Sequence, residues 1–227
     1  PPKNVLPSFW IAAGEMSVKK DEDDRPCLAM GEERFTNVFN KVYDITYGAG
    51  TYYKPTNGDM NDVTDAQRKL FTDNQLLFMD CSFFYAQLLR SMETDFGIIP
   101  YPKYNEDQDR YYSRVSYYNA PVIPISNDRP ELVGAVLEYF NYASSETVIP
   151  AYYDTVLHGK VVRDEESREM LDIIFNSRVV DIGNTTLCAD IRDGKVFTMF
   201  KNEDNNLSSK LPSLEKVMDK FLSKMPE

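Results

Sequence analysis

Residues 69–112 read KLFTDNQLLFMDCSFFYAQLLRSMETDFGIIPYPKYNEDQDRYY, and this stretch sets the predicted fold. The apolar run at residues 76–79 is typical of a strand buried on both faces. Small and polar residues at 80–82 form a corner, and residues 83–90 favour a short helix. A second strand is predicted at residues 96–99, where the following prolines end it. The order strand, corner, helix, strand indicates an α/β sheet.

The corner at residues 80–82 is the first place to expect a functional site. In open α/β sheets, ligands bind beyond the carboxyl ends of the strands. Most acidic residues of the chain lie in charge clusters, such as residues 21–24 and 164–166, whereas Asp80 directly follows an apolar run. An apolar setting is what a catalytic carboxylic acid needs. A single Asp in this setting suits hydrogen bonds to sugar hydroxyls at least as well as it suits catalysis.

The composition indicates a folded, acidic, tyrosine-rich protein. The chain has 227 residues, 42% of them hydrophobic, which is enough for one or two domains with a sizeable core. Acidic residues outnumber basic ones by 36 to 25, and the net charge of −11 argues against nucleic acids and anionic membrane surfaces as partners. The 15 tyrosines suit stacking on sugar rings, although most of them are expected in the core or half-buried at the surface.

Several common catalytic and binding motifs do not occur in the sequence. The three cysteines are widely spaced and form no CxxC pair, and His158 is the only histidine. Few residues are therefore available for a metal site or a Ser-His-Asp triad. Neither glycine-rich phosphate loop is present, nor is HExxH or GxSxG. No apolar run approaches the ~20 residues of a membrane span. We therefore expect no catalytic residue, no metal and no cofactor.

Helices alternate with short apolar strands along the rest of the chain, which is the α/β pattern. Helices are predicted at residues 1–16, 32–47, 64–74, 128–140, 164–175 and 214–225. Further strands are predicted at residues 122–125, 178–182 and 196–200. The acidic run at residues 19–25 lacks the EF-hand spacing and is predicted to be a solvated loop. The helix at residues 32–47 has the clearest apolar face in the first half of the chain.

Aromatic residues supply further candidates for ligand stacking. Trp10 is the only tryptophan, and two interpretations stay open for it: packing in the core, or a ring at the rim of a cleft. Tyr117 and Tyr118 belong to a group of four tyrosines between two predicted strands. Phe83 and Phe84 begin the helix after the corner, and we expect one of the two to be a core residue.

Several segments together resemble the extracellular solute-binding proteins (family 1) of ABC-type sugar importers. The resemblance rests on the order and spacing of LLFMDCSFF (76–84), METDFGIIPYPKYNEDQDRYYS (92–113) and APVIPISNDRPELVGAVLEYF (120–140), preceded by an aromatic segment and an amphipathic helix. It extends over residues 6–225. Two departures are the Asp-Cys-Ser corner, where many relatives have a glycine-containing turn, and Gly134, which replaces an alanine-like residue.

The resemblance implies a type II periplasmic-binding-protein-like α/β fold, of which this chain is the second half. Residues 1–104 and 161–227 would build the C-terminal lobe. Residues 105–160 would be the crossing and hinge segment and part of the N-terminal lobe. The rest of that lobe, a signal peptide and any lipid-anchor cysteine would lie upstream of Pro1.

The helix that returns to the N-terminal lobe would then lack its usual partner surface. Its apolar residues would be exposed, repacked or buried in a dimer. These residues are Val133, Val136, Leu137 and Phe140.

The function that the resemblance implies is that of the substrate-binding component of an ABC importer, not an enzyme. It would hold a small solute, a sugar or oligosaccharide, in a cleft between lobes and deliver it to permease subunits, at the cell surface as a Gram-positive lipoprotein. The expected ligand-binding residues are Trp10, Asp80, Ser82, Phe83, Phe84, Tyr117 and Tyr118. Because one wall of the cleft would be missing, we expect weak binding from this chain alone.

Two other functions are compatible with the sequence. The first is a carbohydrate-active enzyme domain that uses Asp80 with a second carboxylate. The second is an interaction module that keeps the binding-protein fold without a ligand. Oligosaccharide binding without turnover would distinguish the transport function from both.

Overall fold

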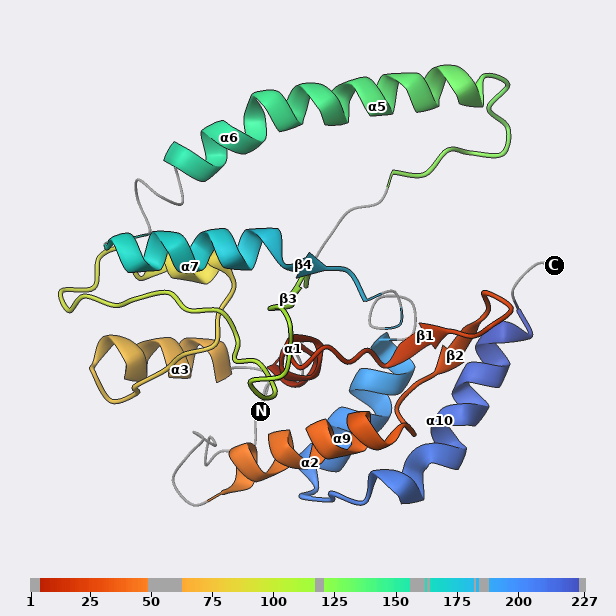
Figure 1. Ribbon diagram of the computed structural model, residues 1–227, viewed down its shortest axis with the longest axis horizontal. Helices are drawn as coiled ribbons and strands as arrows, with labels where there is room; N and C mark the ends of the chain where they lie inside the picture. Colours follow the sequence, from red (N-terminus) through yellow and green to blue (C-terminus); the bar gives the residue numbers. More distant parts are fainter. Residues whose placement is uncertain are drawn as a thin grey trace. The chain divides into compact units, whose positions relative to one another are not determined.

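The structure, a computed structural model, describes residues 5–48, 63–116, 121–155, 162, 164–181, 183 and 188–224 (Figure 1). It is a mixed α/β structure that is mainly helical, with two small two-stranded sheets among the described residues. The chain forms two compact units. Unit 1 comprises Pro1–Met79, Pro100–Ser116 and Asp172–Glu227, and unit 2 comprises Asp80–Ile99 and Tyr117–Leu171.

Unit 1 holds most of the regular structure. Its elements are α1 (Val5–Ala12), β1 (Val18–Lys20), β2 (Pro26–Leu28), α2 (Glu33–Tyr47), α3 (Val63–Thr72), β3 (Ser113–Arg114), β4 (Arg178–Val179), the π-helix η2 (Cys188–Val196), α9 (Phe197–Lys201) and α10 (Leu207–Leu222). Strands β1 and β2 are antiparallel, with Val18 opposite Leu28, and β3 and β4 are parallel, with Ser113 opposite Arg178.

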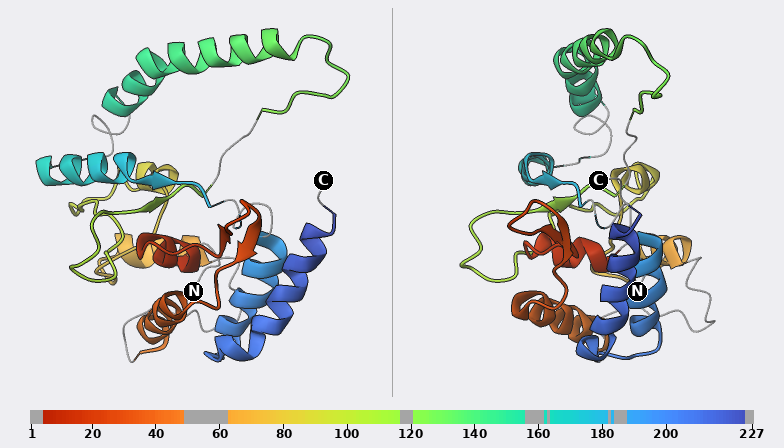
Figure 2. Two further views of the ribbon diagram at one scale, coloured as in Figure 1. Left: turned by 45° about the vertical axis from the view of Figure 1, so that its right-hand side comes forward. Right: turned by 90° about the vertical axis from the view of Figure 1, so that its right-hand side faces the viewer.

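Unit 2 is helical. Its elements are α4 (Phe83–Leu88), α5 (Pro130–Glu146), α6 (Val148–Tyr152) and the first part of α7 (Glu165–Asn176), which continues into unit 1. Figure 2 shows α5 and α6 running end to end, separated at Thr147 by a non-helical backbone with φ −127° and ψ −62°. The boundaries of the two units differ from the predicted lobes, because residues 80–99 group with residues 117–171, so the lobe assignment stays a prediction.

The predicted helices are confirmed where sequence signals mark their ends. Pro130 begins α5, where the missing N–H costs no hydrogen bond. Asp164 caps α7, because its Oδ1 accepts a hydrogen bond from the Ser167 backbone N–H at 2.7 Å and its Oδ2 accepts one from the Ser167 hydroxyl at 2.8 Å. Helix α10 begins earlier than the predicted helix at residues 214–225: it starts at Leu207, where the side chain of Asn206, a cap that was not predicted, accepts a hydrogen bond from the Ser209 N–H.

The sequence interpretation missed a hairpin at residues 18–28. The acidic run is an exposed turn, as predicted, but the residues on either side of it pair as β1 and β2. Asp21 Oδ1 accepts hydrogen bonds from the backbone N–H groups of Asp23 and Arg25, both at 2.9 Å. Asp24 has a φ of 66°, in the left-handed region that Asp tolerates better than most residues. The Asp21 side chain therefore organises this turn.

Most of the predicted strands are wrong. Residues 76–79, 96–99 and 122–125 are not strands, and residues 197–200 belong to α9; only the start of the strand predicted at residues 178–182 is present, as β4. A strand requires a hydrogen-bonded neighbour, and among the described residues none of the first three segments has one. Several of their apolar side chains are accordingly exposed, with Leu77 at 83% and Phe78 at 70%, whereas others are half-buried.

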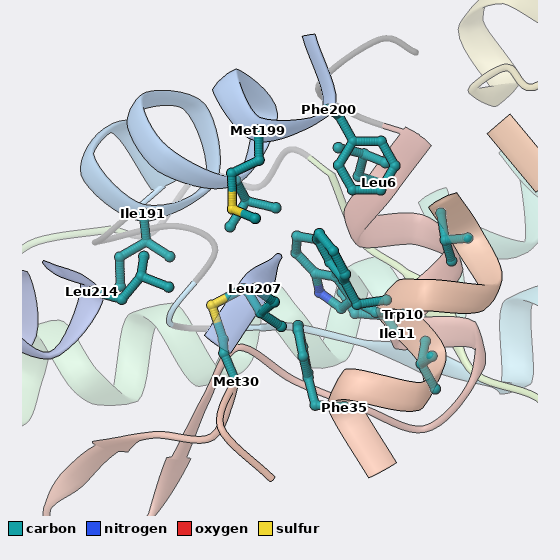
Figure 3. Packing of buried hydrophobic residues seen from close by; sticks show 14 of the residues in the cluster. Leu6, Trp10, Ile11, Met30, Phe35, Ile191, Met199, Phe200, Leu207 and Leu214 are labelled. Carbon is teal, nitrogen blue, oxygen red and sulfur yellow. The ribbon is translucent and has the colours of Figure 1, made fainter. Parts of the chain in front are cut away.

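A continuous apolar core holds unit 1 together (Figure 3). Helix α1 contributes Leu6, Trp10 and Ile11, all nearly inaccessible to solvent. The Trp10 ring lies against Phe35 of α2, with the ring centroids 5.6 Å apart. From the other side come residues of the C-terminal helices, including Ile191, Met199, Phe200, Leu207 and Leu214. The core therefore joins the first and last parts of the sequence.

An aromatic group extends this core between α2 and α9. Phe200 lies edge-on to Phe39, with centroids 5.1 Å apart, and is also in contact with Tyr43 and Tyr47. The two tyrosine hydroxyls donate hydrogen bonds to backbone carbonyls, Tyr43 to Glu203 and Tyr47 to Phe200. Burial, with the negative charge of Glu203 adding to it, raises the pKa of Tyr47 to about 12. The Tyr47 hydroxyl therefore stays a protonated donor.

The first prediction concerns the indole of Trp10, which is 3% exposed and whose Nε1 is buried without a hydrogen-bond partner among the described residues. Trp10→Ala removes a large core side chain and should lower the free energy of unfolding by about 3–5 kcal/mol. Trp10→Phe keeps an aromatic ring in the core and removes an N–H that makes no hydrogen bond in the described part of the chain, so it should lower the free energy of unfolding much less. Urea denaturation followed by circular dichroism measures both. Equal losses in the two variants would contradict this expectation.

The second prediction concerns the cap of α7. The hydrogen bonds from the Ser167 N–H and hydroxyl lower the pKa of Asp164 below its ordinary value. A folded-state pKa below the unfolded one gives stability that is present above the unfolded pKa and lost as the pH falls through the folded pKa. Asp164→Ala should therefore lower the melting temperature at neutral pH, and the difference from the parent should shrink as the pH falls below 3.8.

The matched control for this cap is Glu169→Ala, which removes a carboxylate from the exposed side of the same helix. It should change the melting temperature little. A pH-independent difference between Asp164→Ala and the parent would contradict the cap.

Candidate functional site

The corner at residues 80–82 lies in unit 2 and leads into α4. Ser82 is the N-cap residue, with an extended backbone (φ −82°, ψ 163°), and its carbonyl accepts a hydrogen bond from the Ala86 N–H at 3.1 Å. Its exposed side chain makes no capping hydrogen bond. Asp80 and Phe83 are half-buried. The carboxylate of Asp80, the hydroxyl of Ser82 and the ring of Phe83 thus lie within four residues of one another in the sequence, where the backbone changes from extended to helical.

Helix α4 is held by its buried side. Ala86 is 4% exposed and Leu89, just after the helix, is 2% exposed. Phe83 and Gln87 are four residues apart, so they lie on one face of the helix. The Gln87 side-chain amide donates a hydrogen bond to the Tyr152 hydroxyl of α6 at 3.1 Å. This adds Gln87 and Tyr152 to the candidate site.

Sequence reasoning missed Tyr152 because it lies 65 residues from Gln87. Its one signal is the tyrosine pair at residues 152–153, which is no stronger than other tyrosine pairs in the chain. The polar and aromatic groups near the corner are therefore Asp80, Ser82, Phe83, Gln87 and Tyr152. Together they offer the hydrogen-bonding groups and flat apolar faces that recognise a polar, uncharged ligand.

The other predicted site residues are placed differently. Trp10 lies in the core of unit 1, which favours the packing interpretation over a ring at a cleft rim. Tyr117 and Tyr118 lie outside the described residues, as does the side chain of Phe84. Of the seven predicted residues, the structure brings together Asp80, Ser82 and Phe83.

Cys81 is an exposed thiol within the corner. Desolvation by the surrounding chain, and then the negative charge of Asp80, raise its pKa to about 12 even though the residue has exposed surface. The thiolate is the nucleophilic form of cysteine. At neutral pH this thiol is therefore protonated, which does not suit nucleophilic catalysis.

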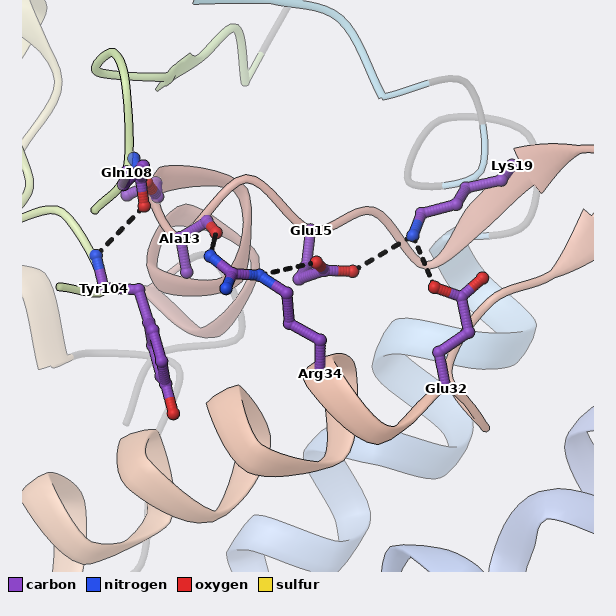
Figure 4. A network of polar contacts seen from close by, with 8 residues as sticks. Ala13, Glu15, Lys19, Glu32, Arg34, Tyr104 and Gln108 are labelled. Carbon is purple, nitrogen blue, oxygen red and sulfur yellow. Dashed lines mark hydrogen bonds and ion pairs between the residues drawn. The ribbon is translucent and has the colours of Figure 1, made fainter.

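A polar network in unit 1 surrounds the end of α1 (Figure 4). Glu15 is 4% exposed and forms ion pairs with Arg34 at 3.1 Å and Lys19 at 3.2 Å. Lys19 also reaches Glu32 at 2.6 Å. Burial opposes the charge of Lys19, but hydrogen bonds to Glu32 and Glu15 outweigh it and raise the pKa of the ammonium group. The buried carboxylate is thus neutralised by neighbouring cations.

A loop residue, Gln108, continues this network. Its side-chain amide donates to the carbonyls of Ala12 at 2.8 Å and Arg110 at 2.7 Å, and its Oε1 accepts from the Tyr104 N–H at 3.0 Å. The Tyr104 ring lies under the guanidinium of Arg34, 5.0 Å from centroid to Cζ. Every group named here has a partner, so the network fastens the acidic loop to α1 and is structural.

Neither a metal centre nor a membrane span emerges from the part of the chain that the structure describes. No group of three or more His, Cys, Asp and Glu side chains there could hold a metal ion. No helix among those residues combines the length and apolar composition that crossing a bilayer requires. No protein-family model, curated protein or solved structure matches the chain.

The third prediction concerns the reactivity of Cys81. With a pKa of about 12, its thiol should react with iodoacetamide far more slowly at neutral pH than the same thiol in the urea-unfolded chain. Asp80→Asn removes the neighbouring negative charge, which lowers the pKa and should speed the reaction. Mass spectrometry resolved to the Cys81 peptide measures the rate across a pH series.

The matched control is Asp95→Asn, which makes the same chemical change at an exposed position of unit 2. It should leave the Cys81 rate unchanged. A folded-state rate equal to that of the unfolded chain would contradict the raised pKa.

Proposed function

We propose that the chain is part of the substrate-binding component of an ABC importer, which captures a carbohydrate and delivers it to permease subunits. In this proposal the fold is of the type II periplasmic-binding-protein kind. The protein acts outside the cell, attached to the surface through a lipid anchor upstream of this chain. It binds its ligand without chemical turnover.

The observation that carries the proposal is the way the chain is divided between its two units. The unit boundaries fall after Met79, Ile99, Ser116 and Leu171, so the chain passes from one unit to the other four times, although the first two crossings fall within the predicted C-terminal lobe. Repeated crossing between two compact units is what a two-lobed binding protein needs, because several crossing segments make a hinge that bends while each lobe stays intact.

The segments on either side of the longest excursion are held together within unit 1. The Ser113 N–H donates to the Ser177 carbonyl at 2.8 Å, and the Val115 N–H donates to the Val179 carbonyl at 3.0 Å. The two serine hydroxyls are also 2.8 Å apart. Strand β3 ends just before the chain leaves unit 1, and β4 follows soon after its return. This pairing holds together the two segments at which the chain leaves unit 1 and returns to it.

The chemistry of the corner supports a sugar as the ligand. A carboxylate at Asp80 accepts hydrogen bonds from vicinal hydroxyls, the Ser82 hydroxyl both donates and accepts, and aromatic rings such as Phe83 stack on the apolar faces of sugar rings. The net charge of −11 favours an uncharged ligand over a phosphorylated one.

The fourth prediction is that the chain binds a short neutral oligosaccharide through the corner. Saturation-transfer difference NMR detects weak binding, so it suits a panel of gluco-, manno-, xylo- and galacto-oligosaccharides. At least one series should give a signal. Asp80→Asn should weaken that binding about tenfold or more, because it removes a charged hydrogen-bond acceptor. Ser82→Ala should weaken it less.

The matched control is Asp128→Asn, an exposed Asp of the same unit, which should leave binding unchanged. Hydrolysis of an oligosaccharide that is lost in Asp80→Asn would replace the proposal with the enzyme alternative. No signal from any series, with circular dichroism intact, would favour the interaction module.

A further inference from the structure

One hydrogen bond joins α6 to α4 across 65 residues of sequence. The Gln87 side-chain amide donates to the Tyr152 hydroxyl at 3.1 Å, and both residues belong to unit 2. Neither side chain is sealed from solvent, because Gln87 is half-buried and Tyr152 is 45% exposed. A dissolved ligand can therefore reach this contact.

The Gln87 amide keeps unused hydrogen-bonding capacity. A side-chain amide has two N–H donors and an acceptor oxygen. Its one side-chain hydrogen bond within the described part of the chain is the one to Tyr152. The second N–H and the oxygen of Gln87 are thus available to a ligand. Because Tyr152 fixes the direction of the amide, less conformational freedom is lost when these atoms bind.

Gln87 also lies beside an aromatic ring of the corner. Phe83 and Gln87 are four residues apart in α4, and this spacing puts the Cβ atoms of two helical residues about 5–6 Å apart on one face. A sugar ring stacked on Phe83 therefore has hydroxyl groups within reach of the Gln87 amide. An amide of fixed direction distinguishes an axial hydroxyl from an equatorial one, because one of the two orientations gives the better hydrogen bond.

We propose, on the basis of the carbohydrate binding proposed above, that Gln87 determines which sugar the corner prefers and that Tyr152 positions Gln87. Gln87 contacts the ligand through its oxygen and second N–H. Tyr152 acts through Gln87, by holding the amide in one orientation. The pair selects among neutral sugars that differ in the configuration of a single hydroxyl.

The test compares the affinities of gluco-, galacto- and manno-oligosaccharides in saturation-transfer difference titrations. The parent should prefer one series. Tyr152→Phe removes only the hydroxyl and should lower this preference about three- to tenfold, which is the effect of one lost hydrogen bond. Gln87→Met should lower the preference at least as much. The double variant should lose no more than Gln87→Met alone, because both side chains act through one contact.

The matched control is Tyr139→Phe, the same chemical change at a tyrosine of unit 2 that is 67% exposed. It should leave the preference unchanged. Equal weakening of every series by Tyr152→Phe would indicate a structural role and refute the inference, as would losses that multiply in the double variant. If the parent binds one series and Tyr152→Phe binds it with the same preference, the inference fails and the proposed function stands. A parent that binds no series would refute both.

A second measurement needs no ligand. The chain has four glutamines, so the side-chain amide signals of Gln87 in a proton–nitrogen correlation spectrum can be assigned by their loss in Gln87→Met. Tyr152→Phe should shift these signals, whereas Tyr139→Phe should not. Unshifted Gln87 signals in Tyr152→Phe, with circular dichroism intact, would overturn the positioning role of Tyr152.

Discussion

The fold of unit 1 depends on the burial of α1. This helix has only eight residues, which is too short for stable helix formation in water without tertiary contacts. Its residues Leu6, Trp10 and Ile11 are buried against side chains from α2 and from the last three helices. The two sheets of unit 1 have two strands of two or three residues each, so they depend on this core for their stability.

The same helix explains where the polar groups are placed. Helix α1 ends at Ala12, and Gly14, whose φ of 82° is readily adopted by glycine, then leads the chain to the buried Glu15. A buried carboxylate is destabilising unless it is paired, and Arg34 and Lys19 pair with it. Gln108 satisfies the carbonyl of Ala12 at the end of the helix. The acidic loop is thus fastened to α1 by an uncharged side chain.

Sequence reasoning found the helices of this protein better than its strands. The helix at residues 32–47 was predictable, because Phe35, Val38, Phe39 and Val42 repeat with the helical period and all four are buried. The run at residues 76–79 has the composition of a buried strand, but pairing depends on a neighbour that composition does not specify. At the candidate site, Asp80, Ser82 and Phe83 were chosen because they follow the strand predicted at residues 76–79; that strand is absent, and only the short helix after the corner is present. Tyr152 was not, since the Gln87 contact joins distant residues.

The sequence by itself determined the longer helices, the cap of α7 at Asp164, the acidic surface and the position of the corner. These properties depend on neighbours within about one helical turn or on composition alone. The tertiary structure decided which apolar residues are buried: Trp10 is in a core, whereas Phe140, on the apolar face of α5, is exposed. The physical reason is that burial requires a matching surface from elsewhere in the chain. Helix α1 has such a surface in α2 and α9, and the structure describes none for α5.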